Sequence, residues 1–154
     1  MSVRPDIIAY SPGNKPVLVV EVKNKRAASP QWAAQMRSNL MSYPAIANSE
    51  YFLLALPDVF YLWRNAATEG PEAEPDYIID PKPLLAPYVD QRVVPLEQIS
   101  SQGIELLTTA WLKDLAASNL TREASSPMLA WLFDSGLYEA IKNGSILPDA
   151  DAAA

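Results

Sequence analysis

Residues 17–23, VLVVEVK, decide the fold expected for this chain, because they join an apolar strand to two charges. Four apolar residues in a row precede Glu21 and Lys23. A short apolar run rich in β-branched residues predicts a strand that is covered on both faces. Because side chains alternate between the two faces of a strand, Glu21 and Lys23 share one face. The strand therefore carries two opposite charges on the same face near its end.

A partner strand is predicted over residues 5–10, PDIIAY, since the cluster SPGNKP between the two runs is typical of a turn. If this turn is symmetric, paired residue numbers sum to 27, and Asp6 lies directly opposite Glu21. The face with Asp6 and Glu21 is then expected to hold Ile8, Tyr10, Val17, Val19 and Lys23. The other face is expected to hold Ile7, Ala9, Leu18, Val20 and Val22.

The expected pairing of Asp6 with Glu21 is a local conflict. Like charges opposite one another destabilise a sheet, and partial burial of two carboxylates adds a cost of several kcal/mol. Conflicts of this kind are expected at functional sites. A Mg²⁺ ion resolves it, because Mg²⁺ binds one or two carboxylates together with waters and phosphate oxygens. Lys23 would orient a metal-polarised water or stabilise charge on a phosphate, which predicts a metal-dependent phosphodiester hydrolase. The structural alternative is that Lys23 forms a salt bridge with Glu21 or Asp6.

The segments that follow predict a helix and a second hairpin. Ser29 and Pro30 are typical of an N-cap and a first helical residue, and helix formers continue until Pro44, giving a helix of about 13 residues. Residues 51–56, YFLLAL, and 59–65, VFYLWRN, flank Pro57-Asp58 and predict two more antiparallel strands. The order over residues 5–65 is thus β-β-α-β-β.

The rest of the chain predicts one domain with a C-terminal helical part. Residues 66–95 contain six prolines and predict an irregular connection, with a short extended piece at Tyr77 to Ile79 and a helical turn near Leu84. Apolar residues recur at helical spacing over 96–117, and a helical pair is expected over 127–142, interrupted near Gly136 and ended by Gly144. The nuclease-like core is placed at 1–95, the helical part at 96–148 and a disordered tail at 149–154.

The composition limits the chemistry that the chain can perform. The sequence has no cysteine and no histidine, which excludes thiol nucleophiles, thiolate zinc, histidine-dependent triads and imidazole metal sites. No long apolar stretch is present, so we expect a cytoplasmic protein that does not enter a membrane. Residues 1–40 have a local charge of +4 within a total of −6, and they supply candidate phosphate contacts at Lys25, Arg26 and Arg37.

The combination of Pro5-Asp6 on one strand with Glu21 and Lys23 on the next resembles the PD-(D/E)xK nuclease superfamily. The hairpin over 51–65 is also similar to the one found in the N-terminal nuclease domains of type I restriction enzymes. The resemblance covers about residues 4–65. It implies a restriction-endonuclease-like, three-layer α/β/α fold with a mixed central sheet. Only five residues precede Asp6, so we expect either that the sheet is trimmed or that a C-terminal helix or a second subunit takes the place of the helix and strand that usually begin this fold.

The resemblance also implies roles for individual residues. Asp6, Glu21 and the main-chain carbonyl of Val22 would hold Mg²⁺ or Mn²⁺, and Lys23 would position the attacking water. Gln35 on the following helix would support the substrate or the water, with Gln31 one turn earlier as a further candidate contact to nucleic acid.

Several functions stay open at this point. A DNA endonuclease is the first, working as a homodimer or with a partner subunit. A nuclease-fold protein that no longer cuts and serves as a binding or assembly subunit is the second, and a hydrolase of a small phosphate ester is the third. The four tryptophans offer base stacking, although apolar neighbours favour core packing: Trp32, Trp63, Trp111 and Trp131.

Overall fold

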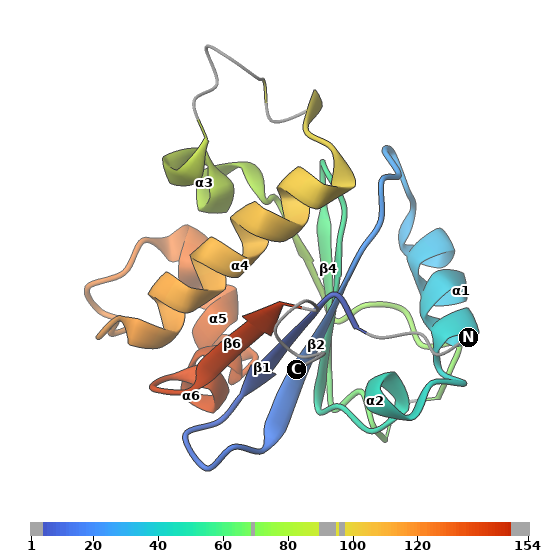
Figure 1. The fold of residues 1–154 in the computed structure, drawn as a ribbon, viewed down its shortest axis with the longest axis horizontal. Helices are drawn as coiled ribbons and strands as arrows, with labels where there is room; N and C mark the ends of the chain where they lie inside the picture. Colours follow the sequence, from blue (N-terminus) through green and yellow to red (C-terminus); the bar gives the residue numbers. More distant parts are fainter. Residues whose placement is uncertain (1–4, 69, 90–94, 96–97, 149–154) are drawn as a thin grey trace.

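The computed structural model describes residues 5–68, 70–89, 95 and 98–148, which form a mixed α/β structure around an open six-stranded sheet. The strand order across the sheet is β5-β4-β3-β2-β1-β6. Helices pack against both faces, with α1 on one side and α4 on the other (Figure 1). The mixed sheet expected from the sequence is therefore confirmed.

The first hairpin has the predicted register over most of its length. Strand β1 (Ile7–Tyr10) pairs antiparallel with β2 (Pro16–Val22), and Ile7 lies opposite Val20. The register shifts between Ala9 and Tyr10, so that Tyr10 lies opposite Pro16. This irregularity changes the face assignment of Val17, which packs in the core with Leu18 and not on the face of Glu21 as expected. An extra residue in one strand of a pair breaks the strict alternation of side chains.

The predicted helix and second hairpin are both present. Helix α1 (Pro30–Leu40) begins as expected, because the Ser29 hydroxyl accepts a hydrogen bond from the Trp32 N–H at 3.0 Å. It ends before Pro44, which instead opens the short helix α2 (Pro44–Ala47). Strand β3 (Tyr51–Ala55) then pairs parallel with β2 and antiparallel with β4 (Phe60–Arg64). The two hairpins are thus joined through a crossover that contains α1.

Each face of the sheet has its own apolar core. The core beside α1 contains Val19, Phe52, Leu54 and Trp63, together with Ala33 of the helix. The core on the other face joins the opposite side chains of the same strands to the C-terminal helices. Nearly every side chain of the central strands is therefore buried, as their continuous apolar runs predict.

The C-terminal part contains short elements and one long helix. Strand β5 (Tyr77–Ile79) pairs with β4, and the turn expected near Leu84 is helix α3 (Lys82–Leu85). The helix expected over 96–117 is α4 (Ser101–Ala117). The expected helical pair is α5 (Ala130–Asp134) and α6 (Leu137–Ile141), and Gly136 separates the two helices. Two short 3-10 helices are also present, η1 (Ala86–Tyr88) and η3 (Pro127–Leu129). Of the described helices, none is long and apolar enough to cross a membrane.

A sixth strand, β6 (Ser145–Pro148), corrects the prediction that residues 96–148 form a purely helical part. It pairs antiparallel with β1, and Ile8 lies opposite Leu147. Gly144 directly precedes β6 and lies close to the backbone of Tyr10. A Cβ at this position would lie 1.9 Å from the Tyr10 carbonyl oxygen, so only glycine fits here. The place beside β1 is therefore taken by a C-terminal strand, not by a helix or a second subunit as expected. The tail predicted at 149–154 lies outside the described residues.

Candidate functional site

Asp6 lies at the start of the first hairpin and is tied to β2 through both its backbone and its side chain. Its N–H donates to the Val20 carbonyl at 3.1 Å. Its Oδ2 accepts a hydrogen bond from the Val22 N–H at 2.7 Å. The pairing of the two strands begins at Ile7 and Val20, so Asp6 lies one residue before the ladder, beside the backbone of Val20 and Val22. The structure therefore brings Asp6 and Glu21 to the same end of the first hairpin.

Glu21 and Lys23 lie at different depths at the end of β2. Glu21 is 3% exposed, whereas Lys23 is partly exposed. The Lys23 N–H donates to the Ala55 carbonyl at 3.1 Å, which fixes the backbone at this end of the sheet. A carboxylate that is this deeply buried is stable in its charged form only if cations or hydrogen-bond donors compensate it. The end of β2 thus places one carboxylate inside the protein and one ammonium group at its rim.

The oxygens at this end of the hairpin suit a hard metal ion. Within the described part of the chain, no group of three or more Asp, Glu, His or Cys side chains is arranged to hold a metal. A metal at this site would therefore bind the carboxylates of Asp6 and Glu21, the Val22 carbonyl, and oxygens from water or substrate. Mg²⁺ is typically bound by a small number of protein ligands, and these ligands are oxygen atoms. The donors are of the oxygen type that this ion prefers.

The connection from β2 to α1 is held by the second hairpin. Ala27 has a φ of 55°, a left-handed conformation that non-glycine residues seldom adopt. Its N–H donates to Asp58 Oδ2 at 2.9 Å. The Tyr61 hydroxyl donates to the Ala28 carbonyl at 2.5 Å, and burial raises the pKa of Tyr61, with the charge of Asp58 as a second cause. These contacts fix the course of residues 24–28 directly beside the carboxylate pair.

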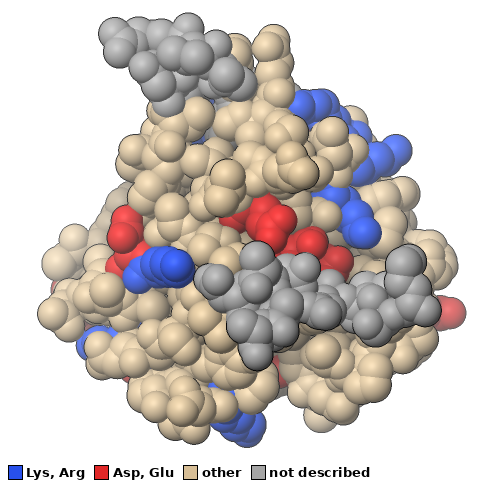
Figure 2. All heavy atoms as spheres, in the orientation of Figure 1, with Lys and Arg blue, Asp and Glu red and all other residues tan. Residues whose placement is uncertain are grey.

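Lys25 and Arg26 are carried by this connection and are both exposed. The Lys25 ammonium lies 5.7 Å from the centre of the Trp32 ring, a cation–π distance. Figure 2 shows lysine and arginine side chains on the side where the β2–α1 connection lies, and acidic side chains in the middle of the same face. The expected phosphate contacts at Lys25 and Arg26 thus have the exposure that their role requires.

Gln35 and Gln31 lie on the exposed side of α1. Gln35 is exposed, and its side-chain amide donates to Asn39 Oδ1 at 3.1 Å. Gln31 is also exposed and donates to Glu74 Oε1 at 3.5 Å. Both glutamines line a hollow of about 200 Å³ that also includes Glu72. The buried face of α1 is formed by other residues, and the supporting role expected for Gln35 stays a prediction.

Arg37 is fully buried, which does not fit the phosphate contact expected from the sequence. Its Nη1 donates to the Gly70 carbonyl and its Nη2 to the Ala66 carbonyl, both at 2.8 Å. The guanidinium carbon also lies 5.6 Å from the centre of the Trp63 ring. Because a helix turns by about 100° per residue, Arg37 shares the inner face of α1 with Ala33. The charge of Arg37 is evident from the sequence, but only the packing shows that its guanidinium holds the chain after β4.

The tryptophans mostly serve the two cores. Trp63 has no exposed surface, and Trp111 is also buried. Trp32 and Trp131 are partly buried and pack against the core on either face. This distribution agrees with the core packing favoured by their apolar neighbours, and only Trp32 lies near the carboxylate pair through its contact with Lys25.

Asp58 and Tyr61 are the residues near the site that sequence reasoning missed. Asp58 belongs to a second Pro-Asp dipeptide, which gives a weak signal because the same dipeptide also occurs at 75–76 and 148–149. Its position is informative only once Val22 is known to lie opposite Ala55, which places the ends of both hairpins side by side.

Comparison of the chain with family models, with curated proteins and with solved structures finds no match.

Proposed function

We propose that this chain is a metal-dependent phosphodiester hydrolase, with DNA as its substrate and Mg²⁺ or Mn²⁺ as its cofactor. The observation that carries the proposal is the register of the first hairpin, because Asp6 lies one residue before the Ile7–Val20 pair and its carboxylate accepts the N–H of Val22, the residue after Glu21. The mixed sheet with helices on both faces is compatible with the restriction-endonuclease-like fold, and β6 would stand where that fold usually has an N-terminal strand.

The residues of the hairpin would divide the work of hydrolysis. Asp6, Glu21 and the Val22 carbonyl would bind the metal, which supplies a polarised water and an electrophile for the phosphate. The Lys23 ammonium, at the rim, would orient the attacking water and stabilise negative charge that develops on the phosphate. Lys25 and Arg26, on a connection fixed by the second hairpin, would bind the phosphates that flank the cleaved bond.

The test is cleavage of single-stranded and duplex DNA with Mg²⁺ or Mn²⁺. Glu21→Gln and Lys23→Ala are each expected to lower the cleavage rate by about 100-fold or more, since each removes a charge from the reaction centre. Lys15→Ala is the matched control, because Lys15 is exposed in the turn at the other end of the hairpin. Cleavage by the wild type that survives both site variants would refute this site.

The same variants report on the alternative in which Lys23 pairs with Glu21 for structure alone. Without metal, Glu21→Gln is expected to leave the melting temperature unchanged or to raise it, because it removes a buried charge beside Asp6. A large fall in melting temperature would support the structural salt bridge instead.

A binding or assembly subunit that does not cut is the second candidate. Two observations favour it: the Asp6 carboxylate already accepts a main-chain hydrogen bond, and the Gln35 amide already donates to Asn39. Isothermal titration distinguishes the two functions, because an inactive subunit would bind neither Mg²⁺ nor Mn²⁺ at this site. Stable capture of a partner by a chain without metal affinity would favour the subunit.

A further inference from the structure

Strand β5 forms one edge of the sheet and pairs only with β4 among the described strands. The chain leading through β5 alternates between outward and inward residues. Exposed side chains recur at every second position, and all but one of them are acidic: Glu72, Glu74, Asp76, Ile78 and Asp80. The chain that leads into β5, passes through it and leaves it therefore presents an acidic strip, in which the one apolar side chain, Ile78, belongs to the edge strand itself.

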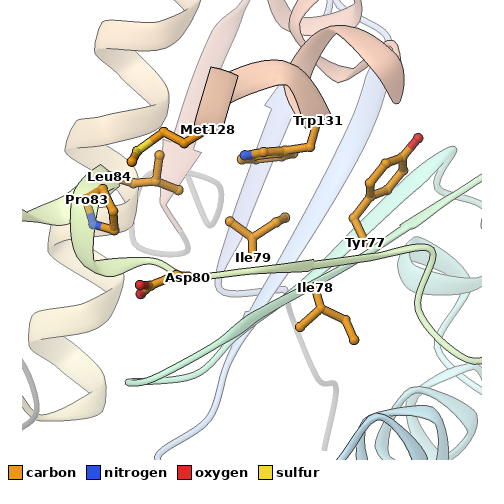
Figure 3. Close-up of a pocket in the computed structure, with 8 residues that line it drawn as sticks. All are labelled: Tyr77, Ile78, Ile79, Asp80, Pro83, Leu84, Met128 and Trp131. Atoms are coloured by element: carbon orange, nitrogen blue, oxygen red, sulfur yellow. The ribbon is translucent and has the colours of Figure 1, made fainter. Parts of the chain in front are cut away.

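A hollow lies beside this edge and is mainly apolar. Its volume is about 220 Å³, and its lining includes Ile79, Leu84, Met128 and Trp131. Figure 3 shows Ile79 and Trp131 on one side of β5 and Ile78 pointing to the opposite side. The Trp131 indole N–H is buried and donates to no acceptor within the part of the chain that the structure describes. The hollow thus combines apolar walls with one unused hydrogen-bond donor.

Two of the largest exposed apolar side chains lie at this edge. Ile78 is 62% exposed and Met128 is 57% exposed. Proteins protect a free sheet edge by placing charges on it, and an acidic strip alone would serve that purpose. Protection does not account for an exposed isoleucine within the strip or for an apolar hollow beside it, since both favour contact with another apolar surface.

The charge of the strip selects among the possible partners. Nucleic acid is disfavoured, because its phosphates would face carboxylates of the same sign. A second copy of this chain paired through β5 is disfavoured for the same reason, since like charges would lie opposite one another. An extended polypeptide with basic residues at alternate positions satisfies the charges, and its backbone can pair with the free edge of β5.

We propose that the β5 edge binds an extended segment of a partner protein in which basic and apolar residues alternate. The segment adds a strand to the sheet beside β5. Its apolar side chains enter the hollow next to Trp131, and its basic side chains lie along Asp76 and Asp80, with Ile78 between them. This surface is distinct from the carboxylate pair of Asp6 and Glu21, so the proposal does not depend on nuclease activity.

The experiment measures the fluorescence anisotropy of labelled seven-residue peptides mixed with the whole chain. The probes are alternating lysine–valine, alternating glutamate–valine, and a peptide of the lysine–valine composition with its lysines grouped at one end. The alternating basic peptide is expected to bind at least tenfold more tightly than either of the others, and its affinity is expected to fall as salt rises. Equal binding of all three peptides, or no binding of any, would overturn the proposal.

Variants of the edge locate the binding. Ile78→Lys is expected to weaken binding of the basic peptide by tenfold or more. Leu106→Lys on α4 is the control, because Leu106 is 72% exposed but lies outside this hollow. Glu74→Gln with Asp80→Asn removes two charges and keeps the acceptor oxygens, and should weaken binding and flatten its salt dependence. Circular dichroism checks that each variant is folded.

Two further readouts decide between occupants. The Trp131 indole N–H resonance, assigned with Trp131→Phe, is expected to shift when the basic peptide binds, because the hollow beside it becomes filled. An unshifted resonance would place the peptide elsewhere and overturn the proposal. Sedimentation that shows a dimer lost in Ile78→Lys would instead make a second copy the occupant of this edge.

Discussion

The two hairpins of this protein each carry a Pro-Asp dipeptide at the same end of the sheet, yet the two aspartates do different things. Asp6 accepts the Val22 N–H at the end of β2. Asp58 accepts the Ala27 N–H and lies beside the connection to α1. Both side chains thus accept main-chain hydrogen bonds, Asp6 from β2 next to Glu21 and Asp58 from the connection that follows β2.

The difference teaches that a short motif obtains its chemistry from its neighbour across the sheet. The first hairpin gives Asp6 an acidic neighbour, which produces a site that a metal ion can complete. The second hairpin gives Asp58 a main-chain donor and no acid, which produces a support for a loop. We therefore expect changes around the second hairpin to alter stability, and changes in the first to alter metal binding.

The largest effect is expected for Arg37→Met, which removes the buried guanidinium that holds the chain after the second hairpin. Two carbonyls, those of Ala66 and Gly70, would lose their charged donor. We expect the free energy of unfolding to fall by about 3 kcal/mol in urea denaturation. Arg26→Met, on an exposed side chain, should change it by less than about 0.5 kcal/mol. Metal affinity should be unchanged in both variants, and its loss in a folded Arg37→Met would break the comparison.

The next effect separates the two aspartates directly. Asp6→Asn and Asp58→Asn keep an acceptor oxygen for the main-chain donors, so both variants should remain folded. Removal of a residue that merely hydrogen-bonds to a metal ligand lowers metal affinity by about 10–100-fold. Loss of the Asp6 carboxylate, a proposed ligand itself, should therefore lower the affinity for Mn²⁺ by at least about tenfold. Asp58→Asn should leave Mn²⁺ affinity within about twofold in isothermal titration. Equal effects in both variants would show that the aspartates do not differ in role.

A smaller effect is expected for Tyr61→Phe, which removes the hydrogen bond to the Ala28 carbonyl and should cost about 1 kcal/mol of stability. The pKa of Tyr61 is raised above its usual value of 10.0 by burial and then by Asp58. Its stabilising contribution is therefore complete below pH 10 and is lost as the pH rises through the raised pKa. Urea denaturation between pH 9 and 11 should show a shallower alkaline loss in Tyr61→Phe than in the wild type. The partly exposed Tyr43→Phe is the control, and the same flattening there would contradict the assignment.

The smallest effect is expected for Ala27→Gly. Ala27 has a φ of 55°, which glycine adopts without the steric cost that an L-residue incurs. Greater freedom of glycine in the unfolded chain opposes this gain, so the net stabilisation should be about 0.5 kcal/mol. Ala110→Gly within α4 should instead destabilise by about 1 kcal/mol. A loss of stability in Ala27→Gly would mean that the connection does not hold this strained conformation in solution.

The local structure around the candidate site was largely predictable from the sequence. The turn between the first two strands is nearly symmetric, so its composition was sufficient to place Ile7 opposite Val20 and to bring Asp6 near Glu21. Ser29 and Pro30 were likewise sufficient to begin α1, since a cap depends on residues within one turn. The irregularity near Tyr10 was not predictable, because the extra residue is accommodated by pairing and not by any local signal.

Long-range packing decided the features that sequence reasoning missed. Strand β6 has four residues and joins the sheet only because β1 offers it a free edge at the other end of the chain. The rotation of α1 over the sheet buries Arg37 and leaves Gln35 exposed, a choice that the sum of all contacts on that face makes.

The sequence by itself determined the strands of the two hairpins, the cap of α1 and the register of the first hairpin, because periodicity, turns and caps act between residues that are near in the chain. The tertiary structure decided how the two hairpins lie side by side, which basic residues reach the surface and which strand closes the edge beside β1. Those outcomes depend on contacts between segments far apart in sequence, and their energies are added only when the whole core is assembled.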